Sequence, residues 1–287
     1  MSMDSRSLYQ KLNEDFELDK CNEGTWGFDL GNYATESFKN TYKGLALDNA
    51  KSINKVYTAV FPSDEVIHRL LDSGEEDILL FTHHPMIWDT SVDGRPWRNI
   101  RHVFLSELKE QRISYYAIHV PLDRNGPYST TVSLAKALRI DPERFFFEYF
   151  GSEVGVMGRT GRSTVSELAE VVKTAVGHKV KVWRYGSEEI KDSQVALVAG
   201  GGGEPEIASE IAEAGLNMYV TGITRMVESY EPSIIFHDVC KENEINVIGA
   251  THYSTEKFAC IALVDYFLKL GLACEFIEDT PSLEDLE

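Results

Sequence analysis

Short runs of apolar residues alternate with helix-like segments along most of the chain, and this alternation constrains the fold more than any other feature. The segment DILLFT at residues 77–82 is a continuous apolar run, which is typical of a strand buried on both faces of a sheet. Further strands are predicted at residues 56–61, 114–120, 179–184, 194–199, 218–221 and 246–249. Helices are predicted at residues 64–73, 99–111, 130–138, 165–176, 206–214, 234–243 and 255–270. Alternation over this length predicts an α/β fold.

The two ends of the chain depart from this pattern. Residues 1–44 are polar and aromatic with weak periodicity, so we expect an irregular or helical extension there. Residues 273–287 are acidic and contain Pro281, and we expect a loose tail. The length of 287 residues allows one large domain or two interlocked lobes.

The charge balance restricts the partners of the chain. There are 46 acidic and 28 basic residues, which give a formal net charge of −18. Such a field repels phosphate backbones and anionic lipids, so direct binding to nucleic acids or membranes is disfavoured. A small anionic substrate stays compatible, because bound metal ions can reverse the sign of the charge locally.

The cellular compartment is predicted from the absence of membrane-spanning, signal-peptide and disulfide patterns in the sequence. No apolar run is long enough to span a bilayer, and the first residues do not resemble a signal peptide. The four cysteines show no CxxC spacing, which fits reduced thiols rather than a disulfide framework or a zinc ribbon. We therefore expect a soluble, cytoplasmic protein.

Residues that can bind metal ions follow three of the predicted strands. The first such segment is FTHHP, with His83 and His84 in adjacent positions. Neighbouring residues of a regular strand face opposite sides, so both histidines can enter one site only if the strand ends there, as Pro85 indicates. The alternative is a pair of histidines in a surface loop.

The second and third segments add carboxylates. In HVPLD, Asp123 follows a strand, where an aspartate also commonly caps a turn. In THYSTE, His252 and Glu256 share one face if a helix begins there. Alternatively Ser254 or Thr255 caps the helix, and the glutamate is a favourable first-turn charge. Sites of open α/β sheets form at the carboxyl ends of strands, so we expect the three segments to meet in one pocket.

The segments THHPMIW, HVPLD and GATHYSTE resemble the signature segments of the NIF-three-like dinuclear metal-centre family. The stretches GVMGRTG, VALVAGGGGE and MYVTG resemble further family segments, and the similarity runs from about residue 45 to residue 271. The resemblance implies that the chain binds two divalent metal ions through five side chains: His83, His84, Asp123, His252 and Glu256.

The resemblance also implies an architecture. It implies two interlocked α/β lobes with mixed sheets, one formed by residues 45–140 plus 245–272 and the other by residues 150–244. It further implies a homohexameric ring with metal sites that face an internal cavity. Family members usually carry Thr-Gly-Glu where this chain has Thr221-Gly222-Ile223, so one carboxylate of the family pattern is missing here.

Three imidazoles and two carboxylates suit Zn, Mn, Fe, Co or Ni rather than Ca or Mg. Two such ions about 3.5–4 Å apart activate water and stabilise both oxygens of a displacement. The leading hypothesis is therefore a metal-dependent hydrolase that acts on a nucleotide or phosphoester, in line with the name type-two GTP cyclohydrolase that family members often carry. The alternative is a non-catalytic metal-binding protein with a regulatory or interaction role. The absence of the family's Thr-Gly-Glu carboxylate slightly favours this alternative.

Two further features have open interpretations. His119 lies four residues before Asp123 and is either a catalytic group that orients a ligand or shuttles a proton, or a structural histidine at a strand end. The glycine run at residues 200–203 could let a phosphate approach a helix N-terminus, but no complete phosphate-binding motif follows it. We favour a tight turn at this run.

Overall fold

The fold divides into two compact units. The computed structural model describes residues 2–21, 23, 29–91 and 96–287. Unit 1 comprises Met1–Leu122 and Cys260–Thr280, and unit 2 comprises Asp123–Ala259 and Pro281–Glu287. Each unit has its own β-sheet with helices packed on it, so the predicted α/β fold class is confirmed. The lobe boundaries expected from the family resemblance stay a prediction.

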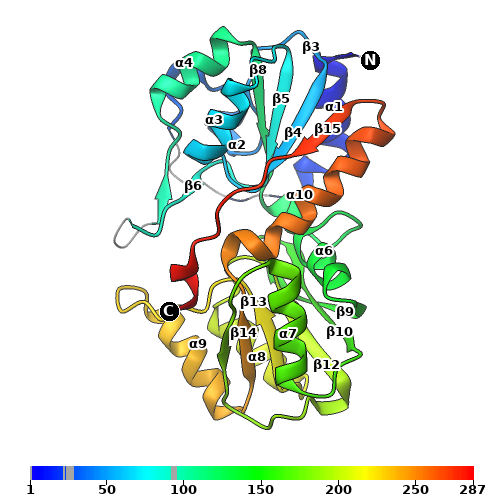
Figure 1. The fold of residues 1–287 in the computed structure, drawn as a ribbon, viewed down its shortest axis with the longest axis vertical. Coiled ribbons are helices and arrows are strands. Elements are labelled where there is room, and N and C mark those ends of the chain that lie inside the picture. Colours follow the sequence, from blue (N-terminus) through cyan, green and yellow to red (C-terminus); the bar gives the residue numbers. More distant parts are fainter. Residues whose placement is uncertain (1, 22, 24–28, 92–95) are drawn as a thin grey trace. The chain divides into compact units, whose positions relative to one another are not determined.

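The sheet of unit 1 is mostly parallel (Figure 1). Its order is β15-β4-β5-β8-β2, and only β2 runs antiparallel to its neighbour. The strands are β15 (Ala273–Phe276), β4 (Lys55–Ala59), β5 (Ile78–Thr82), β8 (Ile113–Ala117) and β2 (Gly44–Leu47). The helices that matter below are α1 (Ser5–Asp15), α3 (Asp64–Asp72), α4 (His102–Glu110) and α10 (His252–Lys269).

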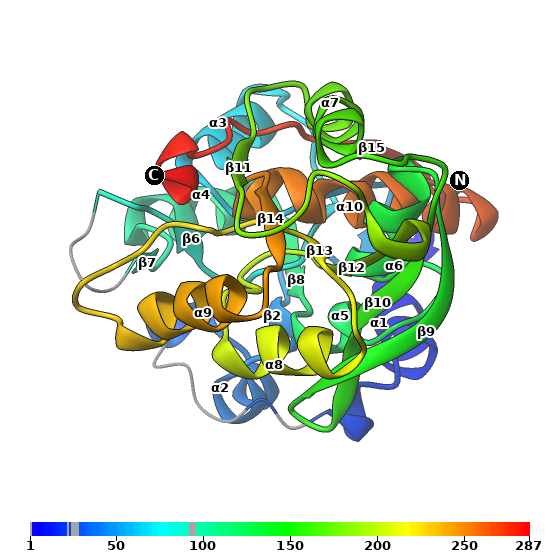
Figure 2. The same ribbon diagram turned by 90° about the horizontal axis from the view of Figure 1, so that it is seen from below.

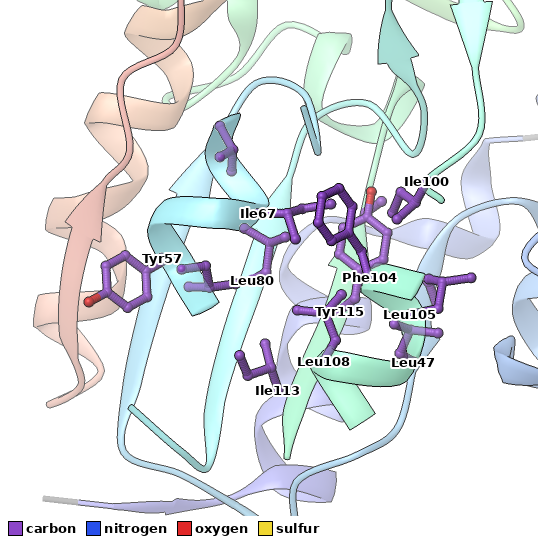
Figure 3. Close-up of a cluster of buried hydrophobic side chains, with 14 of the residues drawn as sticks. Leu47, Tyr57, Ile67, Leu80, Ile100, Phe104, Leu105, Leu108, Ile113 and Tyr115 are labelled. Carbon is purple, nitrogen blue, oxygen red and sulfur yellow. The ribbon is translucent and has the colours of Figure 1, made fainter. Parts of the chain in front are cut away.

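Apolar side chains cover both faces of this sheet. On one face Leu80 and Tyr115 pack against residues of α3 and α4, among them Ile67 and Phe104 (Figure 3). On the other face the Phe81 ring lies 6.1 Å from that of Phe16, which follows α1. Burial on both faces explains why the central strands read as continuous apolar runs rather than as an alternating pattern.

The C-terminal segment corrects one expectation. Residues 273–276 are not a loose tail, because they form β15 and pair in parallel with β4. The flanking Leu272 and Ile277 are 2% and 6% exposed. Short apolar stretches within acidic surroundings are thus enough to anchor this segment. Farther along, Leu283–Leu286 form a 3-10 helix (η4) in which Asp285 and Leu286 are buried.

The sheet of unit 2 is mixed. Its order is β11-β14-β13-β12-β10-β9; β12, β13 and β14 are parallel, and the remaining pairs are antiparallel. The strands are β11 (Lys181–Trp183), β14 (Asn246–Gly249), β13 (Met218–Thr221), β12 (Gln194–Val198), β10 (Ser152–Thr160) and β9 (Ile140–Tyr149). The β9–β10 hairpin is absent from the predicted strands, because a proline and charged residues surround the three phenylalanines of β9 and most of its side chains are exposed.

Helices cover both faces of this second sheet. α7 (Val165–Val176) lies on one side of the parallel strands, and α8 (Pro205–Glu213) and α9 (Glu231–Glu242) lie side by side on the other (Figure 2). Two separate apolar clusters fill the two interfaces. A further short helix, α6 (Thr130–Ala137), belongs to the cluster that contains α7. Among the described residues, no helix combines the length and apolarity that crossing a membrane requires.

Candidate functional site

Both histidines of the first segment lie directly after β5 and are buried. The amide of His83 donates to the carbonyl of Ala59 at 3.2 Å, and that of His84 to the carbonyl of Val60 at 2.9 Å. The exposed fractions of the two residues are 0% and 3%. Their ring centroids are only 4.2 Å apart, so the two imidazoles gather on one side although they are neighbours in sequence. The alternation rule does not separate them, because the regular strand ends at Thr82.

Hydrogen bonds hold each of these histidines in place. His83 Nδ1 lies 3.1 Å from the carbonyl oxygen of Ile118, which can only accept, so Nδ1 carries the proton and the lone pair lies on Nε2. The His84 ring stacks on Phe61 with centroids 4.8 Å apart. Its carbonyl accepts bonds from Thr82 Oγ1 at 2.7 Å and from the Tyr115 hydroxyl at 3.1 Å. Burial raises the pKa of Tyr115, so this hydroxyl keeps its proton.

His119 joins the same group, together with a carboxylate that sequence reasoning missed. The His119 ring lies 5.2 Å from that of His83 and 4.7 Å from that of His84. Its Nδ1 lies 3.1 Å from Glu23 Oε2, and the other oxygen of Glu23 accepts from the amide of Val120 at 3.2 Å. The Glu23 side chain is 1% exposed. No local pattern identifies this glutamate, which lies in a polar stretch with weak periodicity.

Unit 1 thus assembles three nitrogen donors. One ring nitrogen from each of His83, His84 and His119 can be chosen so that all lie within 4.8 Å of one another. A carboxylate that accepts from Nδ1 is the usual outer partner of a metal-binding histidine, because it fixes the ring and makes Nε2 more basic. The set suits a divalent transition metal.

In unit 2 the candidate ligands sit at the start of α10. The helix begins at His252, three residues earlier than predicted, so neither Ser254 nor Thr255 is its N-cap. His252 Nε2 lies 3.1 Å from Glu256 Oε1, and the two residues are 4% and 3% exposed. The shared helix face expected from their spacing is therefore present.

The residue before this helix has an unusual backbone conformation. Thr251 has a φ of 65°, which is rare for a β-branched residue and costs about 1–3 kcal/mol. Its side chain accepts from the amide of Ser254 at 3.3 Å, as an N-cap does. The position of His252 thus depends on a strained turn.

Asp123 brings a second carboxylate to unit 2. It ends the short helix α5 (Val120–Asp123) and accepts a 2.7 Å hydrogen bond from Thr130 Oγ1. One of its oxygens lies within 4.8 Å of one from Glu256. Asp123 is 9% exposed, so two largely buried carboxylates lie close together. Like charges at this distance repel in a poorly solvated place, and a bound divalent cation would offset the repulsion.

The glycine run packs against the same glutamate. Gly200 has a φ of +76°, and a Cβ there would collide with the Glu256 carboxylate. The Gly200 amide donates to Thr255 Oγ1 at 2.9 Å. The chain bends at residues 200–201. A glycine is needed at position 200 because an acidic side chain approaches it closely.

The sequence is similar to a known protein family and to named relatives. The family model Duf34/NIF3 (NGG1p interacting factor 3) matches residues 33–281. A protein of Archaeoglobus fulgidus named GTP cyclohydrolase 1 type 2 homolog is 29% identical over 239 residues, which cover 82% of this chain and 88% of that protein. A protein of the same name from Pyrococcus horikoshii is 29% identical over 246 residues, covering 84% of this chain and 90% of that protein.

Solved structures share the fold. The protein ybgI has a TM-score of 0.74 and 21% identity, with 98% of this chain and 100% of that chain covered. Reduced HcgD from Methanocaldococcus jannaschii has a TM-score of 0.66 and 21% identity, with 97% and 99% covered. The match of the family model over most of the sequence confirms the resemblance: this chain belongs to the Duf34/NIF3 family.

Proposed function

We propose that this protein binds two divalent transition-metal ions and uses them to hydrolyse a nucleotide or phosphoester. The proposed ligands are the five residues of the family pattern: His83, His84, Asp123, His252 and Glu256. The proposal requires all five side chains to reach the same pair of ions. The observation that supports it most is the pair of buried carboxylates in unit 2, Asp123 and Glu256, whose mutual repulsion a divalent cation would offset.

The donor set also indicates which metals to expect. The histidines offer neutral nitrogen, and the acids offer two negative charges that balance only half of the charge of two divalent ions. The remaining positive charge would attract an anionic ligand to a protein with a formal net charge of −18. Zn, Mn, Fe, Co and Ni all suit such a set.

The metal ions, when bound, would supply Lewis-acid activation of water and of a substrate oxygen. The chain itself would supply the proton acceptor. Glu23 accepts from His119 Nδ1, so the lone pair of His119 lies on Nε2. Since His119 is not one of the five proposed ligands, this nitrogen would take up a proton rather than bind a metal ion. We assign His119 this catalytic role. The GTP cyclohydrolase name of the relatives makes GTP the first substrate to test.

Metal analysis of the purified protein tests the centre. We expect close to two equivalents of transition metal per chain after reconstitution, and below about half an equivalent in His84→Ala and Glu256→Ala variants. His237→Gln is the matched control, because His237 is also buried but binds Thr224 O and the Tyr185 hydroxyl instead. Wild-type protein without metal, or variants that keep it, would end the assignment.

A substrate panel tests catalysis. GTP, other nucleotides and simple phosphoesters are incubated with the reconstituted protein, with and without a chelator. Turnover that the chelator abolishes would support the hydrolase. Metal binding without chelator-sensitive turnover would favour the alternative, a non-catalytic regulatory or interaction protein. The homohexamer and the cytoplasmic location stay predictions, and light scattering of the purified protein tests the first.

A further inference from the structure

We propose that Asp285 is a positioning residue for the metal ligand His252, and that the segment Pro281–Glu287 acts as a clasp on the start of α10. The inference deepens the proposed metal centre and rests on it. The segment lies at the limit of the family match, which ends at residue 281, so this contact belongs to a part of the chain that the family model does not cover.

Asp285 makes hydrogen bonds through both its side chain and its backbone carbonyl, and all of them lie within unit 2. Its side-chain oxygen Oδ2 accepts from the backbone amide of His252 at 2.9 Å. Its backbone carbonyl accepts from the amides of Thr224 and Arg225 at 2.9 and 3.0 Å. Asp285 is 1% exposed and its neighbour Leu286 is 2% exposed. The segment is thus anchored by its backbone and by an apolar side chain, and it presents one carboxylate to the helix.

The helix start has a particular need for this carboxylate. The first amides of a helix have no acceptor within the helix, and a negative charge there is favoured by the helix dipole. His252 is the first residue of α10, and Thr251 before it has a φ of 65°. A bond to the His252 amide therefore holds the backbone just after a strained residue. Because the backbone at His252 sets the direction of its side chain, Asp285 positions the imidazole without touching a metal ion.

The experiment compares full-length variants at neighbouring positions of the segment. Asp285→Ala removes the acceptor, Asp285→Asn keeps an oxygen but removes the charge, and Glu284→Gln is the control because Glu284 is exposed. Amide hydrogen exchange of the metal-free proteins is measured for peptides that cover residues 250–257. We expect exchange there to rise about tenfold in the alanine variant and to stay at the wild-type rate in the control.

The second readout is metal binding. Titration with Co²⁺ should show an affinity about tenfold or more below wild type for Asp285→Ala, with a changed visible absorption spectrum. Asp285→Asn should recover part of the affinity, because the amide oxygen can still accept. A loss of fold would raise exchange in every peptide and abolish Co²⁺ binding altogether. If the alanine variant does not fold, the graded change in the asparagine variant still tests the proposal.

The outcomes separate the two proposals. Unchanged exchange in both Asp285 variants would overturn the clasp, and faster exchange with unchanged Co²⁺ affinity would overturn the positioning role. A wild-type protein that binds no Co²⁺ would overturn the metal centre and the positioning role together, while the exchange data would still decide whether Asp285 holds the helix start. Faster exchange with weaker binding in the alanine variant, together with smaller changes in the asparagine variant, supports the proposal.

Discussion

The two units present their candidate ligands in contrasting ways. Unit 1 offers imidazoles at strand ends. The rings of His83 and His119 are each held by a hydrogen bond at Nδ1. Unit 2 offers two carboxylates and one imidazole, with His252 and Glu256 at the start of a helix that follows a strained turn. Neutral rings can be buried together at a small electrostatic penalty, whereas buried acids cannot. In the proposed metal centre, unit 2 is therefore the half whose structure would depend more on a bound cation.

The largest effect is expected at Gly200 in unit 2, where a Cβ would meet the Glu256 carboxylate. Gly200→Ala should destabilise the protein by about 2–5 kcal/mol, since the new methyl group adds overpacking of about 1–3 kcal/mol to left-handed strain of about 1–2 kcal/mol. The methyl group would also displace the Glu256 carboxylate and weaken metal binding. Denaturant unfolding and metal titration measure both effects.

A matched glycine isolates the steric part of this prediction. Gly177 in unit 2 has a φ of +86°, and nothing lies within 4 Å of the place where its Cβ would be. Gly177→Ala should therefore show only the strain of the left-handed conformation and leave metal affinity unchanged. Equal losses of stability and affinity in the two variants would refute the steric link between Gly200 and Glu256.

A medium effect is expected in unit 1 from Glu23→Gln. The substitution keeps the shape of the side chain but removes the negative charge of the acceptor that holds His119 Nδ1. Because His119 is not one of the five proposed ligands, we expect chelator-sensitive turnover to fall about tenfold while the bound metal stays near its wild-type amount. Glu17→Gln is the control, because Glu17 lies in the same N-terminal part and its side chain is 43% exposed. Wild-type turnover in Glu23→Gln would reduce His119 to a structural role.

The smallest effect concerns a histidine of unit 2 that contrasts with His83. His237 has contacts at both ring nitrogens, to Thr224 O at 2.8 Å and to the Tyr185 hydroxyl at 3.0 Å. Burial lowers the pKa of His237 below its ordinary value of 6.5. The unfolded chain therefore takes up a proton first as the pH falls, and the stability from neutral His237 is present above about pH 6.5 and is lost below it.

His237→Gln removes this titration. Between about pH 7 and pH 5 the variant should lose less unfolding free energy than the wild type. Thermal unfolding across this range measures the difference, and metal content should not change. A variant with the same pH profile as the wild type would show that His237 is not buried as a neutral ring.

Many regular elements could be predicted from the sequence. The strands at residues 218–221 and 246–249 and the helix at residues 165–176 lie where their apolar patterns indicate. β9 and β15 could not, because exposed or charged side chains hide their pattern. α10 starts earlier than predicted, because Thr251 adopts a conformation that its residue type disfavours.

The candidate site divides in a similar way. Adjacent histidines before Pro85 and the His-x-x-x-Glu spacing are local patterns, and each brings its two side chains together within one unit. That all five ligands share two metal ions stays a prediction, with metal analysis as its test. The carboxylates of Glu23 and Asp285 carry no recognisable motif, so neither could be found before the structure was known.

By itself the sequence determined the alternation of buried strands and helices, because burial on one or both faces imposes a periodicity that neighbouring residues display. It also determined which imidazole and acidic groups stand at the ends of those strands. Only the tertiary structure decided what orients them. Glu23 reaches His119 across 96 positions and Asp285 reaches His252 across 33, and such bonds form only after core packing has brought distant segments together.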